Sequence, residues 1–223
     1  MIMNDNIKDS IFIHTAKCGG TSMQSIFRKY KIKIDTVTRS WDNCFSCDSK
    51  LSSYFKFTFV RNPWDRMVSN YIMFNTWRKY HWWTKQSFKE FLEFSLNVDF
   101  KQIRQVDMFE AYKRKYKNDT QKKEIESQHK ISIQNHSTPY INPFNRIFDG
   151  GENLIVDFVG RFENLQQDFT VVCDKIGIPK QQLPHKLKSK HLHYTEYYDD
   201  ETRSMVAEAY AKDIDYFGYK FGE

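Results

Sequence analysis

The chain has 223 residues and four cysteines, and its 34 Lys and Arg against 28 Asp and Glu give a formal net charge of +6 at pH 7. This length suits a single domain over residues 1–223, and four cysteines are too few for a disulfide scaffold. No apolar run approaches the ~20 residues of a membrane span, and no signal-peptide pattern is apparent, so we expect a cytoplasmic location. The charge attracts anionic ligands, but no nucleic-acid-binding pattern accompanies it, so no nucleic-acid partner is expected.

The first predicted elements are a buried strand over residues 10–14 and a helix over about 21–30, joined by Lys17-Cys18-Gly19-Gly20-Thr21-Ser22. Two adjacent glycines let the backbone take positive φ and approach a ligand closely. Thr21 and Ser22 are residue types that cap helices, and the helix start offers unpaired N–H groups and the positive end of its dipole. With the charge of Lys17, this stretch predicts a cradle for phosphate or sulfate.

The order of these residues separates the stretch from a Walker A loop, in which the lysine follows the glycines. Here Lys17 precedes them, which argues against an ordinary ATPase or kinase and for a relative with different phosphate geometry. Further along, Leu154-Ile155-Val156-Asp157 imitates a Walker B strand. A nucleotide kinase or NTPase therefore stays open as an alternative.

A second predicted strand over residues 56–60 precedes a helix over 63–75. Asn62 suits the N-cap of this helix, and Pro63 suits its first turn. Arg61 follows the strand directly, at the carboxyl edge where ligands bind in open α/β sheets. Its planar guanidinium is suited to bidentate contact with a phosphate.

The remaining elements are predicted from apolar periodicity and from helix-stop residues. They are irregular segments over 31–54 and 118–153, helices over 87–96 and 100–117, a buried strand over 154–159, a helix that stops at Gly177, and one last helix that ends at Gly218. Strands that alternate with helices predict an α/β fold, a three-layer sandwich whose central parallel sheet has a P-loop-NTPase-like topology.

The two motifs together resemble the sulfotransferases that use 3′-phosphoadenosine 5′-phosphosulfate (PAPS), in their small carbohydrate-type branch of Golgi and bacterial enzymes. Residues 11–22 are similar to the family's 5′-phosphosulfate loop, and residues 59–69 are similar to its 3′-phosphate motif. Residues 159–165 and 197–221 are also similar to stretches of this branch. The family usually has threonine where this chain has Cys18.

The resemblance implies a set of donor-binding residues at matching positions of this chain. They are Lys17, Cys18, Gly19, Gly20, Thr21, Ser22, Arg61, Ser69, Lys188 and Ser189. Lys17 would also be catalytic, because its charge would stabilise the bridging oxygen as the bond to sulfur breaks. Arg61 and Ser69 would hold the 3′-phosphate, and the product would be adenosine 3′,5′-bisphosphate. Arg161 and Glu163 would form a structural ion pair or line the site.

The acceptor hydroxyl needs a general base, since a protonated alcohol is a poor nucleophile. His136 is our first choice, because it lies in the irregular segment that should border the acceptor cleft, and Asp42 and His129 follow. His14 is assigned instead to packing against the first loop or orienting it. A sulfonate carries less charge than a phosphate, so no metal is expected.

The predicted function is transfer of a sulfonate group from PAPS to an acceptor hydroxyl, with a glycan as the expected acceptor. Two other classes stay open: a P-loop nucleotide kinase or NTPase, and a non-catalytic nucleotide- or glycan-binding module. The kinase would need Mg²⁺ and prefer ATP. The binding module would bind the donor without forming a sulfated product.

Overall fold

The computed structural model describes residues 7–35, 53–76, 87–97, 144–148, 153–184 and 191–223. Within these ranges four strands form one parallel sheet in the order β2-β1-β3-β4. They are β1 (Ser10–Ile13), β2 (Lys33–Asp35), β3 (Phe55–Val60) and β4 (Phe158–Arg161). Because β1 and β3 are parallel neighbours, their carboxyl ends lie at the same edge of the sheet, and both predicted motifs start from that edge.

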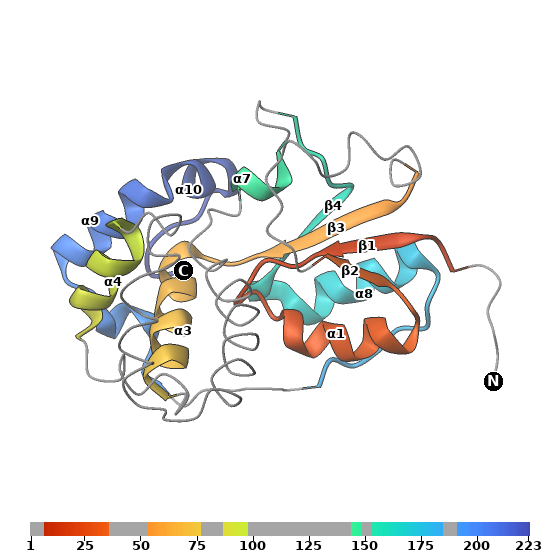
Figure 1. The fold of residues 1–223 in the computed structure, drawn as a ribbon, viewed down its shortest axis with the longest axis horizontal. Coiled ribbons are helices and arrows are strands. Elements are labelled where there is room, and N and C mark those ends of the chain that lie inside the picture. The colour runs from red at the N-terminus through yellow and green to blue at the C-terminus, as the bar shows by residue number, and fades with distance from the viewer. Residues whose placement is uncertain (1–6, 36–52, 77–86, 98–143, 149–152, 185–190) are drawn as a thin grey trace, which may run out of the picture.

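Figure 1 shows two helices along one face of the sheet and a second group of helices toward the carboxyl ends of its strands. On one face lie α1 (Gly20–Lys29) and α8 (Leu165–Ile176), which meet through Phe27 and Phe169 with ring centroids 5.7 Å apart. The other face packs against a second group of helices. These are α3 (Pro63–Thr76), α4 (Phe88–Asn97), α7 (Phe144–Ile147), α9 (Asp200–Ala209) and α10 (Ala211–Phe217). Short 3₁₀ turns precede α8 and α9, at Phe162–Asn164 and Tyr194–Tyr197.

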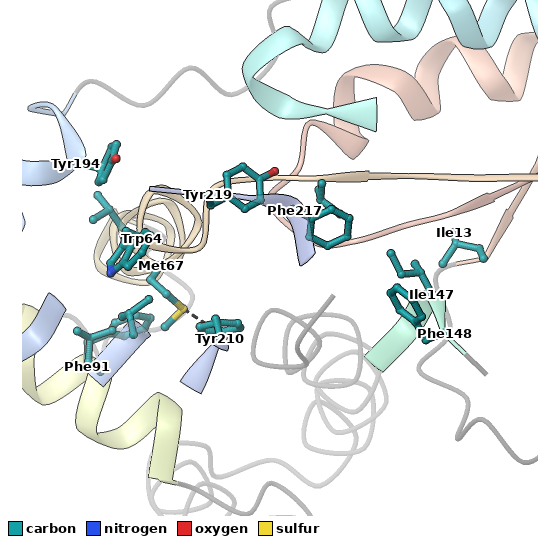
Figure 2. Packing of buried hydrophobic residues seen from close by; sticks show 14 of the residues in the cluster. Ile13, Trp64, Met67, Phe91, Ile147, Phe148, Tyr194, Tyr210, Phe217 and Tyr219 are labelled. Carbon is teal, nitrogen blue, oxygen red and sulfur yellow. Dashed lines mark hydrogen bonds between the residues drawn. The ribbon is translucent and has the colours of Figure 1, made fainter. Parts of the chain in front are cut away.

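Successive side chains of a strand point to opposite faces, and this alternation builds two hydrophobic cores. Ile11 and Ile13 of β1 join the core on the α3 side, part of which Figure 2 shows. Phe12 joins the core beneath α1 and α8. A fully buried side chain of this size contributes ~1.5–3 kcal/mol relative to an exposed one, so both faces hold the layers together. The predicted α/β sandwich around a parallel sheet is confirmed.

The predicted strand over residues 154–159 is wrong in its position, because β4 begins only at Phe158. Leu154 is 40% exposed and makes an isolated antiparallel bridge with Phe148, so the apolar run begins outside the sheet. The pairing of β4 with β3 also needs Gly160, since the ring of Phe59 fills the space that a side chain there would occupy. The apolar run therefore indicates burial here but not the limits of the strand.

The predicted last helix is also wrong, because it is two helices. α9 ends at Ala209 and α10 begins at Ala211, with Tyr210 between them at φ −117° and ψ 25°. The Tyr210 hydroxyl donates to Met67 Sδ of α3 over 3.5 Å (Figure 2), and the Arg66 guanidinium lies over the Tyr210 ring. The helix therefore breaks where Tyr210 packs on α3, and the apolar periodicity of the sequence, which continues through this position, does not reveal the break. The predicted end at Gly218, with a left-handed φ of 67°, is confirmed.

The other predicted boundaries of described helices agree with the structure to within a residue or so. β2 lies in the segment predicted as irregular, because three residues are too few to show the alternation of a strand. The predicted helix over 100–117 lies outside the described residues. No helix in the described part of the chain is both long and apolar enough to cross a membrane.

Candidate anion-binding site

The loop after β1 turns into helix α1 through a glycine with a left-handed backbone conformation. Gly19 takes the left-handed conformation, with φ 78°, and is the N-cap of α1, which begins at Gly20. Thr21 and Ser22, predicted as capping residues, lie instead inside the first turn, where the Ser22 N–H donates to the Gly19 carbonyl over 3.1 Å. No described side chain caps α1. The first N–H groups of the helix and the positive end of its dipole are therefore offered to a ligand.

Both glycines of the loop are required by their surroundings. A side chain at Gly19 would be strained by the positive φ, and its Cβ would meet Leu165 Cδ2 at 2.8 Å. A side chain at Gly20 would overlap the imidazole of His14, so the predicted packing of His14 against the loop is confirmed. The glycines therefore leave the backbone of the loop uncovered by side chains of its own.

Lys17 is the charged residue of this loop. Its backbone is left-handed, with φ 68°, a conformation that costs a residue other than glycine roughly 1–2 kcal/mol. Burial, and next the charge of Arg61, lower the pKa of Lys17 from 10.5 to about 8. The ammonium group is still mostly protonated at neutral pH, and a bound anion would stabilise that charged form.

Cys18 turns its side chain into the core beneath α1 rather than toward the open side of the loop. Its thiol donates to the Ala16 carbonyl over 3.6 Å, and burial raises the pKa of the thiol to about 12. The thiol thus stays protonated and acts as a packing group. A contact between residue 18 and a ligand would therefore come from its backbone.

Arg61 joins the second motif to the first. It follows β3 and is only 8% exposed, and its guanidinium makes three contacts with described residues. Nε donates to Asp65 Oδ2 over 2.7 Å, and Nη1 donates to the Lys17 carbonyl over 3.0 Å. The Phe162 ring covers one face of the group, with its centroid 3.9 Å from Cζ. Since arginine has five N–H groups, hydrogen bonds to described residues leave three of them for an anion.

Asn62 caps α3 as predicted, because its Oδ1 accepts the N–H of Trp64 over 3.1 Å. Its own N–H donates to Glu163 Oε1 over 2.6 Å, and its Nδ2 donates to the Lys220 carbonyl over 2.9 Å. The Tyr198 hydroxyl donates to the Trp64 carbonyl over 2.9 Å. The turn between β3 and α3 is therefore held by segments that are distant in sequence.

The structure brings Lys17 and Arg61 into contact, and it places the buried Ser69 in the second turn of α3. The other predicted donor and base residues lie outside the described ranges. They are Lys188, Ser189 and His136, with the alternative bases Asp42 and His129. Of the residues predicted to bind the sulfonate donor, the structure therefore describes those in the loop after β1, in the turn after β3 and in α3.

Arg161 and Glu163 form no ion pair with each other in the described part of the chain. Arg161 donates to the Phe217 carbonyl and lies over the Tyr219 ring, whereas Glu163 accepts the N–H of Asn62 in the second motif. Sequence reasoning missed Phe162 as part of the site. The similarity of residues 159–165 to the family could have pointed to this segment, but its contacts arise only in the folded chain.

Asp157 lies at the opposite edge of the sheet from both motifs. Its Oδ2 accepts the Lys56 N–H over 2.7 Å and lies 3.5 Å from Lys56 Nζ. Lys56 is near the amino end of β3, whereas the motifs follow the carboxyl ends of β1 and β3. Asp157 therefore cannot act as a Walker B aspartate. The described residues include no group of three or more His, Cys, Asp and Glu side chains that could hold a metal ion.

The fold and these two motifs define an α/β protein with a candidate anion-binding site at the carboxyl edge of a parallel sheet. Comparison with known proteins gives the family, since residues 2–220 match the sulfotransferase family. The chain belongs to that family, whose general activity is the transfer of a sulfonate group from a donor to an acceptor. An uncharacterized protein of Archaeoglobus fulgidus is 26% identical over 128 residues, which cover 57% of this chain and 72% of that protein. No solved structure matches the chain.

Proposed function

We propose that this protein, acting as one domain over residues 1–223, moves a sulfonate group from PAPS to a carbohydrate hydroxyl. The observation that supports this most directly is the 3.0 Å hydrogen bond from Arg61 Nη1 to the Lys17 carbonyl. It joins two anion-binding motifs at one edge of the sheet. A nucleotide with charged groups at its 5′ and 3′ positions would meet one motif with each of them.

The residues present fit such a donor. Leu165 and His14 pack against Gly19 and Gly20, so neither position has room for a side chain. The support for a phosphate or sulfate cradle is the start of α1, which no described side chain caps. In this proposal the 5′-phosphosulfate accepts from the loop and from the start of α1, including Thr21 and Ser22, while Cys18 contributes its backbone only. Arg61 and Ser69 hold the 3′-phosphate, and Lys188 and Ser189 contribute further contacts to the sulfonate donor.

The chemistry required of the protein is positioning and charge stabilisation, as in phosphoryl transfer, because the displacement is in-line and loose. The donor supplies the activated sulfonate and a bisphosphate leaving group. Lys17, whose pKa of about 8 keeps it charged at neutral pH, stabilises the negative charge on the bridging oxygen. His136 takes the proton from the acceptor hydroxyl as general base.

The test is an assay of product formation with PAPS and a panel of glycans. We expect equimolar release of adenosine 3′,5′-bisphosphate and a glycan heavier by one sulfonate, measured by mass spectrometry, and loss of both in His136→Ala. Release of the bisphosphate without a sulfated glycan would mean that the sulfonate passes to water, and that these glycans are not the acceptor. Binding of PAPS with no release in the presence of any acceptor would indicate a binding module, and turnover of Mg-ATP would indicate a kinase.

A further inference from the structure

The turn between β4 and α8 contacts both anion-binding motifs. The Phe162 ring lies on the Arg61 guanidinium, with its centroid 3.9 Å from Cζ. Three residues later, Leu165 packs so closely on Gly19 that a Cβ there would lie 2.8 Å from Leu165 Cδ2. This short segment therefore sets where the two motifs lie relative to each other.

The Arg61 guanidinium is held on two of its edges and on one face. Asp65 accepts from Nε and the Lys17 carbonyl accepts from Nη1. Contacts at the edges alone leave the plane of the group free to tilt. The Phe162 ring opposes such tilting, because it covers one face at a distance where cation–π attraction is effective.

A fixed guanidinium matters for recognition of a phosphate. Bidentate contact needs the planar fork of arginine at one orientation, and a free arginine side chain loses rotamer entropy when it is ordered. A group that is already ordered in the free protein avoids this cost at the moment of binding. The ring beneath Arg61 therefore affects how strongly the remaining N–H donors bind a phosphate.

We propose that Phe162 is a positioning residue that makes the donor site selective for a nucleotide with a 3′-phosphate. This inference rests on the proposed function. Phe162 acts through Arg61, whose Nη1 stays on the Lys17 carbonyl while its free donors meet the 3′-phosphate. The same hydrogen bond supports the left-handed backbone of Lys17, at φ 68°, so recognition of the 3′-phosphate and the position of the catalytic lysine are linked.

The experiment is calorimetric titration of adenosine 3′,5′-bisphosphate and of AMP into the wild-type protein and three variants, Phe162→Leu, Phe162→Tyr and Phe158→Leu. The two ligands differ only in the 3′-phosphate, so the ratio of their dissociation constants reports the contribution of that group. Phe158 is a matched control on β4, since its ring is also half-buried and packs against Phe59 with centroids 6.5 Å apart.

For Phe162→Leu we expect the preference for the bisphosphate over AMP to fall about tenfold while the affinity for AMP is unchanged. Phe162→Tyr keeps the ring, so it and Phe158→Leu should keep the wild-type preference. An unchanged ratio in Phe162→Leu would overturn the proposal. An equal loss of affinity for both ligands would also overturn it, because the ring would then contact the rest of the nucleotide or only stabilise the fold. A wild-type protein that binds both ligands equally would instead contradict the proposed function.

Discussion

The two motifs proposed to bind the charged groups of the nucleotide are built by different means. In the loop after β1 the cap of α1 is local, because Gly19 caps the helix through its backbone and no described side chain takes part, although the distant Leu165 packs against Gly19. The turn after β3 depends on partners far along the chain. Asn62 is held by Glu163, 101 residues away, and by the Lys220 carbonyl, 158 residues away.

Because of this difference, we expect the two motifs to respond differently to substitutions. The first motif should lose its function through changes of one or two residues within the loop, with modest effects on the rest of the fold. The second motif should respond to changes anywhere in the segments that converge on it, and such changes should also lower the free energy of unfolding. Arg61 is the point where the two motifs meet, through its hydrogen bond to the Lys17 carbonyl.

The largest effect is expected for Lys17→Ala, which removes the charge of the first motif. We expect kcat to fall by about a thousandfold, because a hydrogen-bonding group that stabilises developing charge in a buried site contributes about this factor to the rate. The midpoint of thermal unfolding should not fall, since burial lowers the pKa of Lys17 and so opposes its charged form in the folded state. Lys29→Ala, at an exposed position in the last turn of α1, is the control. Activity near the wild-type level in Lys17→Ala would remove the residue from the catalytic site.

A pair of glycine substitutions isolates the geometry of the first loop. Gly19 and Gly218 are both left-handed, at φ 78° and 67°, but only Gly19 has a neighbour where a Cβ would lie. We expect Gly218→Ala to cost about 1 kcal/mol of unfolding free energy in urea, from backbone strain alone. Gly19→Ala should cost ~1–3 kcal/mol more, because Leu165 must move, and should also abolish donor binding. Equal costs, with binding retained in both, would show that the loop is not the cradle.

The pH dependence of donor binding tests the charge of Lys17 without changing the fold. Its pKa is lowered to about 8, so the free protein carries the charge below that pH and loses it as the pH rises through it. Adenosine 3′,5′-bisphosphate should therefore bind about tenfold more weakly at pH 9 than at pH 7. Lys17→Arg should bind with a flat pH profile over this range, because arginine stays protonated. A flat profile in the wild-type protein would contradict the role of Lys17 in binding.

The smallest effect is expected for the cap of the second motif. Asn62→Ala removes both the acceptor for the Trp64 N–H and the donor to the Lys220 carbonyl, and should lower the unfolding free energy by about 1 kcal/mol, with a similar weakening of nucleotide binding. Asn164→Ala is a matched control, since Asn164 occupies the N-cap of α8 but makes no capping hydrogen bond with its side chain. The control should lie within about 0.5 kcal/mol of the wild type. If the two variants were equally stable, the cap would not support the motif.

The same contrast explains what the sequence could predict. The loop from Lys17 to Ser22 was predicted together with its strand and helix, because glycine conformation and a helix start are local properties. The N-cap at Asn62 could also be predicted, because its hydrogen bond joins residues two positions apart. The Phe162 ring on Arg61 and the Glu163 carboxylate on Asn62 were not predictable, since β4 must pair with β3 before these residues meet.

Two errors have physical causes of the same kind. The apolar run that starts at Leu154 indicated burial correctly for Val156 but could not fix the register of β4, which depends on Gly160 fitting beside the Phe59 ring. The break at Tyr210 coincides with packing on α3, which helical periodicity does not encode. Tertiary contacts decided both.

The central claim is that the two motifs bind the two charged ends of one nucleotide. The most direct measurement is calorimetric titration of adenosine 3′,5′-bisphosphate into the wild-type protein and Arg61→Ala, with AMP and Mg-ATP as controls. We predict micromolar binding of the bisphosphate to the wild type, at least about tenfold tighter than AMP, and loss of this preference in Arg61→Ala. Tighter binding of Mg-ATP, or a preference for the bisphosphate that survives in Arg61→Ala, would contradict the claim.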